Sequence, residues 1–499
     1  MRRFTIVYVR GDKLNMGTGT LVYVVLLALI AVAIIVTACL SLAIHNEKKP
    51  TGKATLSHNV SLRIVKIINA LLMTLCFSIV WYYYYLSRTD APFYAKGSYA
   101  IVFLFLVLYA ILGRVYEAFN MSHYRVSEMV YSQTLASGAA DFIMYIVICL
   151  LSKGFPNLLP GIICWVVQMA VAVHWSLISK RWFFAIFKRK STVVVYDRDR
   201  GIQDLLREGE LSKKFDVQKV MTAEECIADL SQLHAIDTVF VGGVHSHERN
   251  IILKYCVAHN IRMYVIPRVG DVIMNGARPT HMFHMPVLMV GRYNPSPEYL
   301  TVKRLFDILV SGVAFIIFSP IMLITAIAIK ATDHGPIIYK QVRLTQNGRE
   351  FNILKFRSMR VDAEKDGVAR LSSGDKDDRI TPVGKIIRAC RVDEMPQLIN
   401  ILRGDLSIVG PRPERPQIHK QYCEQFPEFD LRLQCKAGLT GFAQVYGQYN
   451  TQPYDKLQLD LLYIAHPSFI EDLKICLATV KILFLPESTE GIDPSQTTA

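Results

Sequence analysis

Long runs of apolar residues dominate the first third of the chain. A helix needs about 20 apolar residues to cross the hydrocarbon core of a bilayer. Five runs approach or exceed that length, of which the third and fourth are short: residues 20–44, 64–86, 99–113, 139–151 and 158–177. After an N-terminal segment of residues 1–19, residues 20–185 are therefore predicted to form a transmembrane bundle of about five spans.

Basic residues orient these spans, because Lys and Arg concentrate on the cytoplasmic side of membrane proteins. They gather in the loop 46–62 and directly after the fifth run, so both segments are expected inside. Five spans then place the basic N-terminus outside. Four spans and a first helix lying on the membrane would keep it inside, but we retain five. Asp141, near the start of the fourth run, is interpreted as a structural acid close to the interface.

Residues 190–295 alternate short β-branched runs with helical patterns, which predicts a Rossmann-like α/β domain with a parallel sheet. No Gly-x-Gly-x-x-Gly follows the first run, and its turn carries Asp197 and Arg198 instead. Without those glycines the backbone cannot approach a pyrophosphate closely, so a regulatory or structural domain is favoured over an NAD site. The predicted strands are residues 192–196, 216–221, 238–242, 262–267 and 286–290.

A last apolar run, residues 308–329, is interrupted by Ser319 and Pro320. A proline inside a helix removes a hydrogen bond and bends the helix. Basic residues flank both ends of the run. The pattern alone fits two structures equally: a hairpin that enters and leaves on the cytosolic face, and a kinked helix that spans the membrane.

Composition narrows the class of protein. The chain is 52% hydrophobic with a net charge of +14, which indicates an anionic membrane surface and anionic substrates. Nucleic acid is the weaker alternative, because the basic residues alternate with membrane-length apolar runs. The ten cysteines form no Cys-x-x-Cys pair, which favours reduced thiols over a zinc site. The polar residues 486–499 are predicted to be a disordered tail.

The candidate chemistry centres on the adjacent carboxylates Asp393 and Glu394. The apolar spacing over residues 395–402 predicts a helix, with Pro396 in its first turn. The pair is therefore expected at a helix N-terminus, where free N–H groups favour carboxylate and phosphate. A carboxylate beside a phosphate site can act as a nucleophile, although an isolated acidic pair is more often a simple helix cap.

Basic residues surround this pair in the sequence. Arginine is suited to bidentate phosphate contacts. Each cation alone is more often a solvated surface group, but a cluster around one acidic pair, next to a membrane element, favours phosphate chemistry. The cluster comprises Lys355, Arg357, Arg379, Arg388, Arg391, Arg412 and Arg415.

With these motifs in place, residues from about 303 to 484 resemble the bacterial sugar transferase family, the monotopic polyprenyl-phosphate phosphoglycosyl transferases. The whole chain resembles the large subgroup, whose members start O-antigen, capsule and exopolysaccharide synthesis and usually have four spans. One departure is Arg391-Val392, where the family more often has Ser-Leu. The matching motifs are Lys303-Arg-Leu-Phe-Asp307, Ser319-Pro320, Gly335-Pro-Ile-Ile-Tyr-Lys-Gln341, Lys355-Phe-Arg-Ser-Met359, Arg379-Ile-Thr-Pro-Val-Gly384, Asp393-Glu394-Met-Pro-Gln397, Gly404-Asp-Leu-Ser-Ile-Val-Gly-Pro-Arg-Pro413, Lys436-Ala-Gly-Leu-Thr-Gly441 and Asp460-Leu-Leu-Tyr463.

The resemblance implies a membrane α-helical bundle, a Rossmann-like α/β domain, and a mixed α/β monotopic catalytic domain over residues 300–485. It implies that helix 303–331 is re-entrant, broken at Ser319 and Pro320. The active site would then lie on the cytosolic face of the bacterial inner membrane, in contact with membrane lipid. A homodimer is a further expectation from the resemblance, and nucleic acid is not expected as a partner.

The resemblance also implies a reaction. Asp393 would attack the β-phosphorus of a UDP-sugar and release UMP, and undecaprenyl phosphate would then attack the phosphosugar–aspartyl intermediate. Magnesium would offset charge on the diphosphate, with Asp393 and Glu394 as ligands, and Glu394 could alternatively be a base partner. The sequence does not select the sugar. The implied substrate-binding residues are Lys355, Arg357, Arg379, Arg388, Arg412 and Asp460.

Two other classes of protein are weighed against this. A catalytically silent membrane regulator or scaffold of polysaccharide export would show a damaged acidic pair or basic cluster, and neither is damaged. An ordinary glycosyltransferase would release UDP rather than UMP.

Overall fold

The computed structural model describes residues 54–89, 95–122, 124–187, 189–197, 211–360, 379–447 and 452–483. The predicted first span 20–44, the N-terminal segment 1–19 and the tail 486–499 lie outside the described residues. The chain divides into two compact units, with the boundary after Tyr264. Each unit is described by itself.

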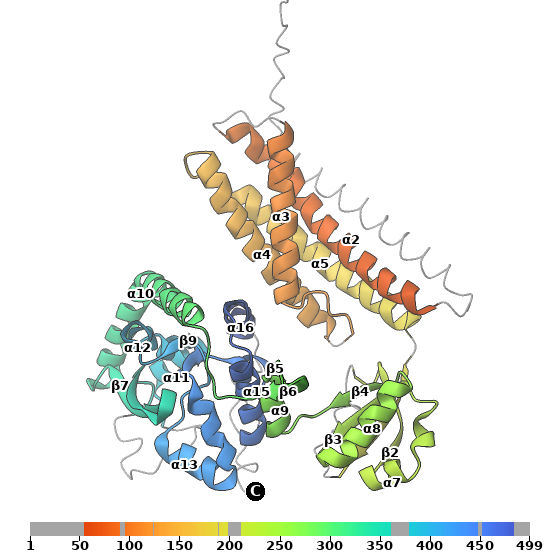
Figure 1. The fold of residues 1–499 in the computed structure, drawn as a ribbon. Helices are drawn as coiled ribbons and strands as arrows, with labels where there is room; N and C mark the ends of the chain where they lie inside the picture. Colours follow the sequence, from red (N-terminus) through yellow and green to blue (C-terminus); the bar gives the residue numbers. More distant parts are fainter. Residues whose placement is uncertain are drawn as a thin grey trace, which may run out of the picture. The chain divides into compact units, whose positions relative to one another are not determined.

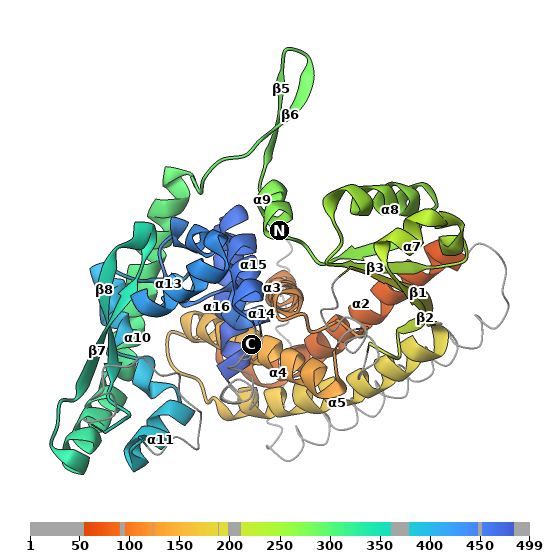
Figure 2. The ribbon, with the colours of Figure 1, turned by 90° about the horizontal axis from the view of Figure 1, so that it is seen from below.

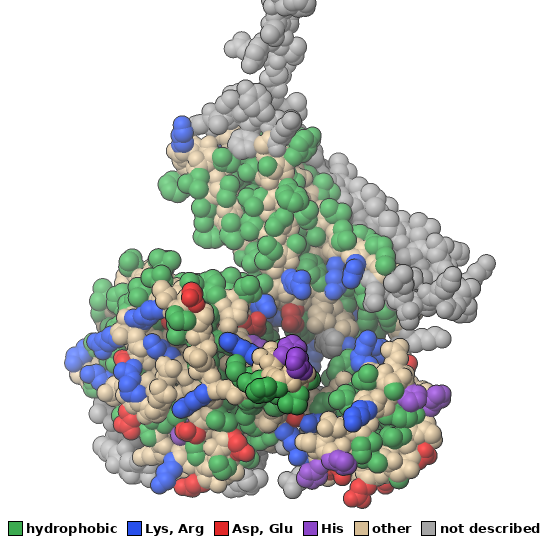
Figure 3. Space-filling model, viewed as in Figure 1, with side chains coloured by type: hydrophobic (Ala, Val, Ile, Leu, Met, Phe, Trp, Pro, Cys, Tyr) green, Lys and Arg blue, Asp and Glu red, His purple; other side chains and the backbone are tan. Residues whose placement is uncertain are grey.

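Among the described residues, the first unit contains four long apolar helices that lie side by side (Figure 1). Each is long and apolar enough to cross a membrane, so the second to fifth predicted runs are confirmed as helices of that length. On the face that Figure 3 shows, hydrophobic side chains gather over these helices, as expected of helices that face lipid. The helices are α2 (Ala54–Val80), extended by a π-helical turn (Trp81–Tyr85) and a 3-10 turn (Leu86–Arg88), α3 (Ala95–Val115), α4 (Val126–Leu151) and α5 (Leu159–Ile186).

Helix α4 begins 13 residues before the apolar run that predicted it. The run marked only the second half of the helix, because the first half carries polar residues that face the bundle interior. Gln133 accepts a hydrogen bond from Asn69 Nδ2 at 3.0 Å, and Tyr109 donates to Asn69 Oδ1 at 2.7 Å. Such bonds join helices where no water competes. Placing Asp141 near the start of a span was therefore wrong, since it lies in the second half of α4.

The rest of the first unit is built on a four-stranded sheet with the order β2-β1-β3-β4, in which β1 pairs in parallel with β2 and with β3. Buried valines of β1 and β3 form its core with α7 and α8. The first four of the five predicted strands are thus confirmed as members of one sheet. The elements are β1 (Lys190–Tyr196), β2 (Phe215–Met221), α7 (Ala223–Ala228), a 3-10 helix (Leu230–Leu233), β3 (Thr238–Gly242), α8 (Ser246–Ala258) and β4 (Arg262–Val265).

The fifth predicted strand is confirmed as a strand, but it does not join this sheet, so its assignment to the parallel sheet was wrong. Strand β6 (Met285–Met289) pairs antiparallel with β5 (Arg278–Met282) in the second unit. The turn residues Phe283 and His284 both have positive φ, 48° and 67°, the conformation that closes a two-residue hairpin. Figure 2 shows this hairpin extending as a narrow ribbon from α9 (Val269–Asn275).

The second unit is a mixed α/β fold. Strands β7 (Ile338–Leu344) and β8 (Glu350–Phe356) form an antiparallel hairpin, and β9 (Ser407–Val409) pairs in parallel with β10 (Gly438–Thr440). Buried Phe351, Ile401, Phe429, Leu457 and Ile475 pack together in its core. The helices are α10 (Pro297–Asp333), α11 (Pro382–Ala389), α12 (Gln397–Arg403), α13 (Pro416–Gln425), α14 (Phe442–Tyr446), α15 (Pro453–Ala465) and α16 (Phe469–Leu483), with 3-10 turns at Gln346–Gly348, Val392–Glu394 and Pro427–Gln434.

Helix α10 contacts this α/β fold near both of its ends. Near its start, Lys303 pairs with Asp472 of α16 at 2.8 Å. Near its end, Ile329 packs with Phe356 and Ile387. Between them, side chains such as Ile316 are exposed, and the helix is apolar enough to enter a membrane.

Candidate active site

The acidic pair lies in a short 3-10 turn, Val392–Glu394, which leads into α12. Arg391 before it has a φ of 52°, a left-handed conformation that separates this turn from α11. The pair therefore precedes the helix by a few residues instead of occupying its first turn. Pro396 stands directly before the first residue of α12, where its missing N–H is harmless.

Glu394 is held by two cations that come from distant parts of the sequence. Lys355 Nζ, on β8, lies 2.9 Å from Glu394 Oε1, and Arg412 Nη2, in the loop after β9, lies 3.1 Å from the same oxygen. Burial raises the pKa of Glu394, but the charges of Lys355 and Arg412 outweigh burial and hold the pKa below its usual value. Glu394 is therefore ionised and fixed in place.

Asp393 differs from its neighbour. Within the part of the chain that the structure describes, no hydrogen bond or ion pair engages its carboxylate. Burial, and then the charge of Glu394, raise the pKa of Asp393, while Lys355, Arg388 and Arg412 oppose that rise. The site thus places a paired carboxylate, Glu394, beside one that is unpaired among the described residues, Asp393. The cations around them are suited to bind phosphate.

The other residues that were predicted to bind substrate differ in burial and in their distance from the acidic pair. Arg388, in the last turn of α11, is close enough for its charge to act on Asp393. Arg357 is buried beside Gly335, where an added Cβ would come within 2.0 Å of its guanidinium. The backbone carbonyl of Arg379 accepts a hydrogen bond from Arg360 N at 3.0 Å. Asp460 is 1% exposed and contacts Arg432 instead of an open surface.

Arg412 reaches Glu394 from a loop that starts where two strands approach closely. At Gly410 an added Cβ would lie 2.3 Å from the carbonyl oxygen of Lys436, so only glycine fits without moving the backbone. The Gly410 N–H donates to Thr440 O at 2.9 Å, which ties this loop to β10. The close approach explains why glycines recur in the motifs at both ends of this contact.

Sequence reasoning missed the residues behind this loop. Arg432 and Arg343 both contact it, and Glu414 lies between them in the loop itself. Arg343 follows Gln341 by two residues on β7, so the strand period could have indicated a shared face. Arg432 lies outside every recognised motif, and no spacing indicates its role.

A long apolar helix packed on an α/β fold, with an acidic pair set among cations, indicates a membrane-associated enzyme that handles phosphate groups. The family model for the bacterial sugar transferases matches residues 298–486. The chain therefore belongs to the bacterial sugar transferase family, as its relatives also show.

Three relatives illustrate the match. The chain is 35% identical over 234 residues, 46% of its length, to the UDP-N-acetylgalactosamine-undecaprenyl-phosphate N-acetylgalactosaminephosphotransferase of Aeromonas hydrophila, of which the match spans 54%. It is 39% identical over 191 residues, 37% of its length, to the UDP-glucose:undecaprenyl-phosphate glucose-1-phosphate transferase of Caulobacter vibrioides, of which 71% is covered. It is 37% identical over 192 residues, 36% of its length, to an exopolysaccharide production protein of Rhizobium leguminosarum, of which 94% is covered. The chain thus spans about half of the Aeromonas relative.

Proposed function

We propose that this chain transfers a sugar phosphate from a UDP-sugar to undecaprenyl phosphate and releases UMP, at the cytosolic face of the bacterial inner membrane. This would be the first membrane step of polysaccharide synthesis. The observation that carries the proposal is the Asp393 carboxylate, which no hydrogen bond or ion pair engages among the described residues. It lies beside Glu394, which Lys355 and Arg412 hold at 2.9 and 3.1 Å. The Aeromonas and Caulobacter relatives are named for sugar phosphate transfer to undecaprenyl phosphate, which supports the same reaction here.

In the first step, a carboxylate oxygen of Asp393 attacks the β-phosphorus of the UDP-sugar. The bond from that phosphorus to the bridging oxygen breaks, the oxygen leaves with the α-phosphate, and UMP is released. The β-phosphate, still carrying its sugar, is then joined to Asp393 as an acyl phosphate. Cations that surround the pair stabilise the charge that moves onto the leaving phosphate.

In the second step, an oxygen of undecaprenyl phosphate attacks the same phosphorus. The bond to Asp393 breaks, the carboxylate is regenerated, and the product is an undecaprenyl diphosphate sugar. Lys355, Arg388 and Arg412 are the cations that act electrostatically on Asp393, so they are suited to bind the phosphates of both substrates in turn.

Magnesium fits this site as a partner of the substrate. Among the described residues, no three His, Cys, Asp or Glu side chains gather to hold a metal ion alone. Mg²⁺ commonly binds through one or two carboxylates plus substrate phosphates, so Asp393 and Glu394 would hold it together with the diphosphate. When bound, Mg²⁺ would offset negative charge on the diphosphate.

We also propose that α10 is re-entrant. Three observations support this. Pro320 lies inside the helix, and the Ser319 hydroxyl donates a hydrogen bond to Ile316 O at 2.8 Å. Residues near both ends of α10 pack on the same α/β fold. A helix that enters and leaves on one face would keep the acidic pair where the soluble nucleotide and the lipid phosphate meet. A homodimer and a Rossmann-like fold for the domain that contains β1 to β4 remain expectations from the family resemblance.

The test is a UMP-release assay on the purified full-length chain with UDP-sugars and undecaprenyl phosphate. Asp393→Asn is expected to abolish UMP release, because an amide cannot replace the nucleophilic carboxylate. The matched control is Asp430→Asn, since the Asp430 side chain is 69% exposed and contacts only His419 among the described pairs. Activity retained by Asp393→Asn would refute the assignment, and release of UDP would indicate an ordinary glycosyltransferase.

A further inference from the structure

The loop that presents Arg412 is held by its backbone. Four consecutive carbonyls, from residue 411 to residue 414, each accept a hydrogen bond from a donor outside the loop. Gly438 N donates to Pro411 O at 2.9 Å, and Leu344 N donates to Glu414 O at 3.0 Å. The two carbonyls between them are bound by side chains: Arg432 Nη2 donates to Arg412 O and Arg343 Nη1 to Pro413 O, both at 3.0 Å.

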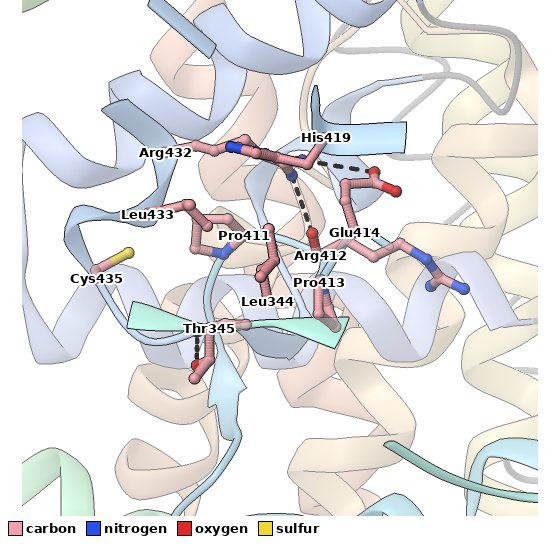
Figure 4. Close-up of a pocket in the computed structure, with 11 residues that line it drawn as sticks. Leu344, Thr345, Pro411, Arg412, Pro413, Glu414, His419, Arg432, Leu433 and Cys435 are labelled. Carbon is pink, nitrogen blue, oxygen red and sulfur yellow. Dashed lines mark hydrogen bonds and ion pairs between the residues drawn. The ribbon is translucent and has the colours of Figure 1, made fainter. Parts of the chain in front are cut away.

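Figure 4 shows the Arg432 guanidinium beside the backbone of Arg412, with a dashed line to the Arg412 carbonyl oxygen. The Nε and Nη2 of Arg432 lie 3.0 and 2.6 Å from Asp460 Oδ2, and its Nη1 lies 3.5 Å from Glu414 Oε1. The side chains of Arg432 and Asp460 are 3% and 1% exposed. A buried ion pair with this geometry fixes the guanidinium, since leaving either charge alone in the interior is strongly unfavourable.

Burial separates the two arginines by role. Arg432 is too deeply buried to meet a soluble nucleotide, whereas the Arg412 side chain is 45% exposed and lies 3.1 Å from Glu394. Asp460 is likewise enclosed, and its contact with the site runs through Arg432 to the Arg412 carbonyl. The three residues form a chain of contacts that ends at the acidic pair.

We propose that Arg432, held by Asp460, is a positioning residue that fixes the backbone of Arg412 so that its guanidinium meets both Glu394 and the diphosphate of the sugar nucleotide. Asp460 then acts on the substrate indirectly. This inference rests on the proposed function, because it uses a diphosphate substrate bound by Arg412.

The test compares Arg432→Lys, Arg412→Gln and the double variant by steady-state UMP release. Lysine keeps a cation beside Asp460 but loses the fork that also reaches the Arg412 carbonyl. Arg432→Lys is expected to raise KM for the UDP-sugar about tenfold or more, the loss typical of one charge-assisted hydrogen bond. KM for undecaprenyl phosphate is expected to change less than about twofold, and the double variant should match Arg412→Gln within about twofold.

A merely structural role gives a different result. Arg432→Lys would then lower the melting temperature but leave both KM values of the folded protein unchanged, and its effect would multiply with that of Arg412→Gln; either outcome overturns the proposal. If Arg432→Lys does not fold, Asp460→Asn removes the charge that holds Arg432 and is expected to raise the same KM. Arg349→Lys is the control, because its pair with Asp405 is 59% exposed on the arginine side. Wild-type chain without UMP release would refute the proposed function, whereas active wild type with unchanged KM in Arg432→Lys and Asp460→Asn would refute only the positioning role.

Discussion

Helix α10 is joined to the helix that follows the acidic pair by one arginine, and this contact yields a quantitative prediction. Arg304 Nη1 donates to Ile401 O at 2.6 Å, and its Nη2 donates to Leu402 O at 2.8 Å. Both carbonyls lie in the last turn of α12, where Ile401 O also accepts a hydrogen bond from the Gly404 N–H at 3.0 Å. The residue to change is therefore Arg304, and the variant is Arg304→Gln.

The expected loss follows from the two bonds. A hydrogen bond to a charged group contributes about 1.5–3 kcal/mol, and a neutral one about 1 kcal/mol. A cation at a helix C-terminus adds about 0.3–1 kcal/mol. Glutamine can restore one neutral bond but neither the charge nor the second bond, so Arg304→Gln should destabilise the second unit by about 2–6 kcal/mol. Lysine keeps the charge and one donor, so Arg304→Lys should lose about half as much.

The assay is thermal unfolding of the detergent-solubilised chain, followed by the melting transition of the second unit. For a unit of 150–250 residues, a loss of about 1 kcal/mol lowers the melting temperature by about 2–4 °C, so Arg304→Gln should lower it by at least about 4 °C. Arg349→Gln serves as the control, because its surface ion pair should contribute less than about 1 kcal/mol. The reasoning fails if Arg304→Gln melts within about 1 °C of the wild type, or if Arg304→Lys is no better than Arg304→Gln.

Two further predictions concern the acidic pair and the loop beside it. Gly410→Ala should destabilise the second unit by about 3 kcal/mol or more, because its Cβ would lie 2.3 Å from the Lys436 carbonyl oxygen; Gly270→Ala, where nothing lies within 4 Å, should be nearly neutral in the same melting experiment. Since the folded-state pKa of Glu394 is depressed, its ionised form should stabilise the fold above the usual pKa of 4.5, and that contribution should be lost as the pH falls below it. Melting curves of wild type and Glu394→Gln should thus differ at pH 7 and converge in acid; a difference that stays constant down to pH 3 would contradict this.

The helices could be predicted from the sequence wherever one physical property ran along the whole element. Apolar composition alone located the spans, because a bilayer selects for it over an entire helix. The prediction placed the start of α4 too late, since Gln133 and its polar neighbours hydrogen-bond inside the bundle, where composition resembles that of a loop. The apolar residues 286–290 were assigned to the wrong sheet because their partner strand is local and is set by turn conformations at Phe283 and His284.

Only the acidic pair and the cations that contact it could be predicted from the sequence. Motifs identified the acidic pair, and the pairing of Glu394 with Lys355 and Arg412 agrees with the predicted cluster. The residues behind the Arg412 loop could not be predicted, because a buried arginine such as Arg432 looks the same in the sequence as a surface arginine. Its role depends on a carbonyl brought to it by the fold, and backbone carbonyls carry no sequence signal.

The contacts of Glu394 explain why an enzyme of this kind would need two carboxylates instead of one. Two adjacent, partly buried carboxylates repel each other, and an unpaired couple would share a proton and lose its nucleophile. Lys355 and Arg412 bind Glu394 directly, so they compensate its charge without engaging the oxygens of Asp393. Glu394 thereby holds Lys355 and Arg412 close to Asp393, although neither cation binds Asp393. In this position the two cations can also bind a phosphate of the substrate. Replacing Glu394 by glutamine would remove the anchor of both cations, and we expect Lys355 and Arg412 then to turn toward Asp393 and reduce its reactivity. A Glu394→Gln chain that releases UMP as fast as the wild type would show that the second carboxylate does not have this role.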